Sequence, residues 1–162
     1  MKIVVAETRD HIRDAQKLFE EYGATLPPEL WFEDFQQEID GLPGEYGPPF
    51  GRLLLAIADD GEAAGCVGLR QWESRTAEMK RMYVRPVYRR RGIGKNLALA
   101  IIREAANISY ERVVLDTAPT MTDAIRLYEA LGFRRTEPYR HHPIDDVIFM
   151  ELDLNLKRET ST

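Results

Sequence analysis

The residues from Lys80 to Lys95 combine arginines and closely spaced glycines in a pattern suited to binding anions. The segment reads KRMYVRPVYRRRGIGK. An alternating strand pattern stops at Pro86, three consecutive arginines follow, and Gly92 and Gly94 open a long helical pattern. A glycine-rich turn at a helix N-terminus leaves backbone N–H groups unpaired at the positive end of the helix dipole. We therefore expect this segment to bind phosphate, and specifically the pyrophosphate of a nucleotide-bearing cofactor.

The charge distribution also favours a small anionic ligand. Seven of the 22 Lys and Arg residues lie between residues 80 and 95, where there is no acidic residue, although the formal net charge is −5. A basic focus on an acidic chain suits a compact polyanion better than DNA or RNA. We therefore expect no nucleic-acid partner, although a nucleic-acid-binding domain that uses residues 80–95 remains a distant alternative.

Composition and length indicate a globular α/β protein. The chain has 162 residues, of which 44% are hydrophobic and 30% charged, as in an ordinary globular domain. No apolar stretch approaches the roughly 18 residues that cross a bilayer, and the first residues suit a strand better than a signal peptide. The single cysteine, Cys66, excludes an internal disulfide. These features predict a cytoplasmic protein with no membrane partner, and no His/Cys/carboxylate spacing suggests a metal site.

The elements around the glycine segment are predicted from hydrophobic periodicity and turn residues. Asp10 is expected to cap the first helix, which Pro27-Pro28 ends, and Thr120 or Thr122 to cap the last helix, which ends at Gly132. The glycine- and proline-rich loop 41–51 is expected to lack regular structure. Strands are expected at 1–6, 52–58, 64–72, 76–84, 112–117, 133–136 and 147–152, with the other helices at 31–39 and 92–107. The resulting order is β-α-α-β-β-β-α-β-α-β-β, with a strand–helix–strand unit at its centre.

Two common phosphate motifs do not fit the glycine spacing. A P-loop needs a glycine five residues before Gly94 and a serine or threonine after Lys95, but the chain has Arg89 and Asn96 there. A dinucleotide fingerprint needs a glycine where Leu97 stands.

The pattern Arg89-x-x-Gly92-x-Gly94, after the strand end Met82-Tyr83-Val84, resembles the acetyl-CoA motif of the GNAT N-acetyltransferase family. The later segment AIRLYEALGF, residues 124–133, is similar to that family's second motif, a helix that carries a tyrosine and ends in Gly-Phe. The resemblance covers most of the chain. It implies a GNAT-like acyl-CoA N-acyltransferase fold, with a central mixed, mostly antiparallel, twisted sheet of about seven strands and about four helices. Residues 1–154 would form a single domain, followed by a polar tail at 155–162.

The resemblance implies that acetyl-CoA is the acyl donor and that its pyrophosphate lies on the N–H groups of residues 90–95. Backbone groups of Met82 and Val84 would pair with the pantetheine arm, as an added strand does. Met121 departs from the family, because many relatives have an asparagine there that contacts the cofactor; Asp123 or water would substitute. The full set of expected cofactor-binding residues is Met82, Tyr83, Val84, Arg89, Arg90, Arg91, Gly92, Ile93, Gly94, Lys95, Thr117, Asp123 and Leu127.

The implied reaction is direct transfer of the acetyl group from the thioester to a primary amine in a ternary complex. Tyr128 would protonate the leaving thiolate, and Glu78 would act as the base that deprotonates the amine. The alternative for Tyr128 is a core aromatic residue, and for Glu78 an ordinary strand glutamate paired with Lys80. Other candidates for the base are Glu45, Tyr46, Glu73 or a water chain, and His141 and His142 could line the acceptor side.

The acceptor itself is not predicted beyond an amine of a small molecule or a peptide. A non-catalytic acyl-CoA-binding or regulatory module is the competing function. A homodimer is an alternative to a monomer, because dimers are common among relatives.

Overall fold

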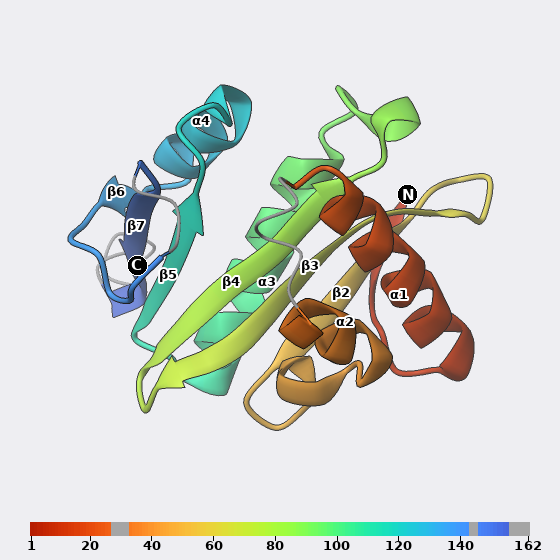
Figure 1. Ribbon diagram of the computed structural model, residues 1–162, viewed down its shortest axis with the longest axis horizontal. Helices are drawn as coiled ribbons and strands as arrows, with labels where there is room; N and C mark the ends of the chain where they lie inside the picture. The colour runs from red at the N-terminus through yellow and green to blue at the C-terminus, as the bar shows by residue number, and fades with distance from the viewer. Residues whose placement is uncertain (27–32, 143–145, 156–162) are drawn as a thin grey trace.

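The computed structural model describes residues 1–26, 33–142 and 146–155 and contains one seven-stranded sheet (Figure 1). The strand order is β1-β2-β3-β4-β5-β7-β6. Among neighbouring strands only β4 and β5 run parallel. The predicted element order and the mixed, mostly antiparallel sheet are therefore confirmed. The strands are β1 (Lys2–Val5), β2 (Arg52–Ile57), β3 (Ala63–Glu73), β4 (Thr76–Val84), β5 (Arg112–Thr117), β6 (Arg134–Arg135) and β7 (Ile148–Asp153).

Helices cover both faces of the sheet and form two apolar clusters. Helices α1 (Arg9–Ala24) and α2 (Glu33–Asp40) pack on one face, together with the short 3-10 helix η2 (Gly44–Tyr46). Helices α3 (Ile93–Ile108) and α4 (Thr122–Ala130) contribute to the cluster on the other face. No helix in the described part of the chain is long and apolar enough to cross a membrane.

Strands β4 and β5 separate partway along their length (Figure 1). They pair only from Thr76–Arg112 to Glu78–Val114, although β4 continues to Val84 and β5 to Thr117. Beyond these pairs β4 carries a bulge against β3, where Arg81 has a φ of 61°. A bulge increases the local twist of a strand, which helps to turn β4 away from β5. We call the diverging segments, residues 79–84 and 115–117, the fork.

Several local expectations are corrected by the structure. The side chain that caps α1 is Thr8, whose Oγ1 accepts from the N–H of His11 at 3.1 Å, whereas Asp10 lies in the first turn. Met121, not a threonine, occupies the N-cap of α4 and makes no side-chain capping bond. The loop 41–51 is not entirely irregular, because it contains η2.

Other predicted boundaries shift by a few residues. The second helix begins at Glu33 and extends to Asp40, and Pro27-Pro28 and Trp31 lie outside the described residues, as does the tail from residue 156. The sixth strand is only Arg134–Arg135, shorter than the predicted 133–136. By contrast, β4 and β5 have the predicted bounds, and Gly132 ends α4 with a φ of 103° as a helix-terminating glycine. Cys66 is buried in β3.

Candidate active site

The loop between β4 and α3 holds a row of unpaired backbone donors. The short 3-10 helix η3 (Pro86–Tyr88) follows β4, and Arg90 and Gly92 then take left-handed conformations, with φ of 65° and 77°. In the described part of the chain, none of the N–H groups of residues 90–95 donates a hydrogen bond. Because α3 begins at Ile93, these donors lie at the positive end of its dipole. This geometry suits an anion, as the glycine spacing predicts.

The arginines of this loop have different surroundings. The Nε of Arg89 donates to the carbonyl oxygen of Val84 at 2.9 Å and thereby ties the loop to the end of β4. Arg90 is exposed, and Arg91 lies over the ring of Tyr88 with 5.4 Å from its guanidinium carbon to the ring centroid. Lys95 is exposed on the first turn of α3. The loop therefore presents one tethered cation and several exposed ones around the free N–H groups.

The N-terminus of α3 meets the end of β4 and helix α4. A Cβ atom on Gly94 would lie 3.9 Å from Val84 Cγ2 and 4.0 Å from Leu127 Cδ2, which are ordinary contacts. Ile93 is buried in the core, and Thr117 ends β5 on the other side of the fork. Asp123 is exposed in the first turn of α4. Most of the predicted cofactor residues thus lie around the mouth of the fork.

The end of β4 directs backbone groups into the fork. The N–H of Arg85, just after β4, donates to the carbonyl oxygen of Ala64 of β3 at 2.8 Å, so Arg85 and Ala64 form a hydrogen-bonded pair of the ladder. In an antiparallel ladder such pairs alternate, so Val84 points its N–H and C=O away from β3. Tyr83 is not brought to the fork: its ladder partner is Cys66, and its hydroxyl lies 3.4 Å from Glu21 on α1. Met82 packs its side chain on the α3 face.

Tyr128 lies on α4 with its ring in the core. It is 6% exposed, and its ring centroid lies 5.7 Å from that of Phe133. Its hydroxyl makes no hydrogen bond with any described residue. Burial raises the pKa of Tyr128 above its ordinary value, so the phenol stays protonated near neutral pH. The core role and a donor role are both compatible with this position.

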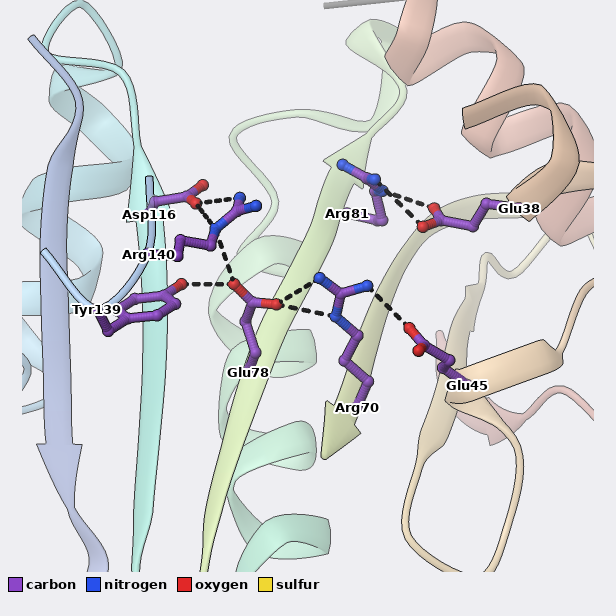
Figure 2. A network of polar contacts seen from close by, with 8 residues as sticks. All are labelled: Glu38, Glu45, Arg70, Glu78, Arg81, Asp116, Tyr139 and Arg140. Carbon is purple, nitrogen blue, oxygen red and sulfur yellow. Dashed lines mark hydrogen bonds and ion pairs between the residues drawn. The ribbon is translucent and has the colours of Figure 1, made fainter. Parts of the chain in front are cut away.

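Glu78 is the centre of a polar network at the base of the fork (Figure 2). It is the last residue of β4 that pairs with β5, and it is fully buried. Its Oε1 accepts from Nε and Nη2 of Arg70, both at 2.8 Å, and its Oε2 accepts from the hydroxyl of Tyr139 at 2.5 Å. The Nε of Arg140 lies 3.5 Å from the same Oε2. We call these residues, with Glu45 and Asp116 at the two ends, the Glu78 network.

The two arginines extend the network in opposite directions. Arg70 also donates from Nη1 to Oε2 of Glu45 at 2.9 Å, and Arg140 binds Asp116 of β5 through Nε and Nη2. Both oxygens of Glu78 are therefore already engaged by donors. The expected alternative, a pair with Lys80, is wrong, because Glu78 pairs with Arg70 of the neighbouring strand and with the segment after β6.

The other candidates for the base are distributed unevenly. Glu45 belongs to the network through Arg70, and Tyr46 is buried beside it with a hydroxyl that has no hydrogen-bond partner among the described residues. Glu73 is exposed at the far end of the β3–β4 hairpin, away from the fork. His141 is exposed, and the residues 143–145 that follow the two histidines lie outside the described part.

Four network residues were not among the candidates from sequence: Arg70, Asp116, Tyr139 and Arg140. Arg70 could have been found, because the short hairpin between β3 and β4 sets the register that places it opposite Glu78. Tyr139 and Arg140 lie in an irregular segment whose pattern indicates no element, and they reach Glu78 only because that segment returns beside β5.

Comparisons with known proteins agree with this geometry. Residues 5–133 match the acetyltransferase (GNAT) family. An uncharacterized N-acetyltransferase of Schizosaccharomyces pombe is 38% identical over 143 residues, which are 88% of each chain. The N-acetylaspartate synthetase of Danio rerio is 37% identical over 106 residues, which are 63% of this chain and 38% of that protein.

The fold also matches solved structures. An N-acetyltransferase from Thermoplasma acidophilum in complex with coenzyme A superposes with a TM-score of 0.73, at 18% identity, and covers 94% of this chain and 99% of its own. Fold and site together define an acyl-CoA-dependent acyltransferase. The chain belongs to the GNAT acetyltransferase family, and its acyl donor is acetyl-CoA.

Proposed function

We propose that this chain transfers the acetyl group of acetyl-CoA directly to a primary amine of a small molecule or peptide, within a ternary complex. The observation that carries the proposal is the row of free N–H groups at residues 90–95, at the mouth of the fork. The diphosphate of coenzyme A supplies the acceptor oxygens that these donors lack. Arg90, Arg91 and Lys95 add positive charge around it.

The pantetheine arm lies along the unpaired edge of β4. The N–H of Val84 faces the fork, whereas its carbonyl oxygen is already held by Arg89. The same N–H is suited to stabilise the negative charge that develops on the thioester oxygen during transfer. Leu127 beside Gly94, together with Thr117 and Asp123 across the fork, completes the expected contacts.

Tyr128 assists departure of the thiol. Burial raises the pKa of Tyr128 above its ordinary value, whereas a free thiol titrates at about 8.5, so full proton transfer from the phenol to the thiolate is unfavourable and Tyr128 acts as a hydrogen-bond donor to the sulfur while the thiolate leaves. A hydrogen bond from the phenol to that sulfur fits the unpartnered hydroxyl. The proton of the amine travels to Glu78 through the Tyr139 hydroxyl, which can accept a proton while it donates its own to Oε2.

The test is release of free thiol from acetyl-CoA in the presence of amines, combined with calorimetry of acetyl-CoA binding. Free amino acids are tested first as acceptors, because the N-acetylaspartate synthetase of Danio rerio is similar to part of this chain. Polyamines and peptide N-termini are tested next. We expect acetyl-CoA binding and acceptor-dependent thiol release. Binding without release for any amine would instead support a non-catalytic acyl-CoA-binding module.

A further inference from the structure

Two donor groups near the Glu78 network have no protein partner. The ammonium of Lys80 makes no ion pair or hydrogen bond with any described residue. Tyr46 is only 2% exposed, and its buried hydroxyl also has no hydrogen-bond partner in the described part of the chain. An unsatisfied buried hydroxyl costs about 1–3 kcal/mol, so such a group is expected to serve a ligand.

The two donors belong to neighbouring positions on one sheet face. Lys80 pairs across the ladder with Gly68 of β3. A Cβ atom on Gly68 would lie only 2.7 Å from Cδ1 and 2.8 Å from Cε1 of Tyr46, so the ring occupies the space where a side chain would stand. Lys80 follows Glu78 by two residues and therefore shares its face of the strand. The missing side chain of Gly68 thus allows Tyr46 to lie beside Lys80.

The charged groups around these donors are already paired with one another. Arg81 binds Glu38 at 2.8 Å and lies over the ring of Phe35. Arg70 and Arg140 bind the carboxylates of the Glu78 network. Among the described residues around these donors, Lys80 is the cation without an ion pair. Burial lowers its pKa to about 8, although Glu78 and Asp116 act to raise it and Arg81 and Arg140 act further to lower it. A desolvated ammonium that forms no ion pair of its own favours an anionic ligand.

We propose that Lys80 and Tyr46 bind a carboxylate of the acceptor, so that the acceptor is an amino acid or another amine that carries a carboxylate. This inference rests on the proposed function of the same site. Lys80 lies on β4 between Glu78 and the segment along which we place the pantetheine arm. The rise along a strand is about 3.3 Å per residue. A carboxylate of the acceptor bound at Lys80 therefore leaves the amine of the same molecule within reach of both Glu78 and the thioester.

The experiment compares each L-amino acid with its own carboxamide as acceptor, in a thiol-release assay. We expect the wild type to prefer the acid over the amide by about tenfold or more in kcat/KM, as is typical of charge-assisted hydrogen bonds. Lys80→Met should bring this ratio close to one through a higher KM for the acid, and Lys80→Arg should retain part of the preference. Lys17→Met, on the exposed side of α1, is the matched control and should keep the wild-type ratio.

Tyr46→Phe provides a second variant that separates ligand binding from folding. Because its hydroxyl has no partner among the described residues, its loss removes the cost of an unsatisfied buried group, so the free energy of unfolding should stay the same or rise while the KM for the acid increases. Equal use of acid and amide by the wild type, or an unchanged ratio in Lys80→Met, would overturn the inference. In either case thiol release with the amides would still support acetyl transfer, whereas absence of acetyl-CoA binding by calorimetry would overturn the proposed function itself.

Discussion

The segment of residues 89–95 between β4 and α3, which we propose binds the cofactor and call the cofactor loop, differs from the Glu78 network in how its polar groups are used. In the loop, consecutive backbone donors remain free and the arginines are largely exposed, whereas in the network nearly every charged side chain is paired with another. The loop is one contiguous segment, while the network joins η2, β3, β4, β5 and the segment after β6. A binding site for the acyl donor can thus be built from the backbone of one local segment. The binding site for the amine depends on side chains that only the tertiary structure brings together.

The largest effect is expected from Gly94→Glu in the cofactor loop. The new carboxylate would stand among N–H groups that bind the diphosphate and would repel it, so affinity for acetyl-CoA should fall by about 100-fold or more. Calorimetry measures this loss, and Gly94→Ala is the control, since a Cβ there makes only ordinary contacts. Normal affinity in Gly94→Glu would show that the diphosphate binds elsewhere.

The network can be tested with Glu78→Gln. Removal of the charge leaves Arg70 and Arg140 with one carboxylate fewer, and loss of the buried partner of these ion pairs should cost about 3 kcal/mol of unfolding free energy. Urea denaturation measures the loss. The control is Glu111→Gln, whose exposed pair with Arg75 should be worth under about 1 kcal/mol. Equal stabilities of the two variants would contradict the contrast between a paired network and a solvated surface.

Tyr128→Phe tests the hydrogen bond that we propose between the phenol of α4 and the departing thiol. The hydroxyl has no hydrogen-bond partner among the described residues, so stability and acetyl-CoA affinity should stay close to wild type while kcat falls by about tenfold or more. Stopped or continuous thiol-release assays give kcat, and thermal unfolding gives the stability control. An unchanged kcat with a good acceptor would leave Tyr128 as a core aromatic residue only.

The smallest effect concerns pH. Below about pH 8 Lys80 is an ammonium and can bind a carboxylate, whereas above that value it becomes neutral. The preference for an amino acid over its amide should therefore decline severalfold as pH rises through about 8. Lys80→Arg should show no such decline, because its guanidinium remains charged. A decline of the same size in both proteins would assign the titration to another group.

Much of the fold follows from local pattern. β4 and β5 have the predicted bounds, since alternation and a short apolar run are strong strand signals, and Gly132 ends α4 because only glycine accepts its positive φ at little cost. The cap of α1 was assigned to Asp10 rather than Thr8, because Thr and Asp are both good caps two residues apart and only the packing of the helix selects between them.

The unpaired N–H groups of the loop between β4 and α3 could be predicted from the sequence, because glycine conformation and helix start are local properties that a contiguous motif encodes. The sequence also determined the order of the elements and, through two motifs, the family. Only the tertiary structure decided what surrounds Glu78 and which donors stay unpaired. Arg70, Tyr139 and Tyr46 are far apart in the chain, and no periodicity records that folding brings them to one face of β4.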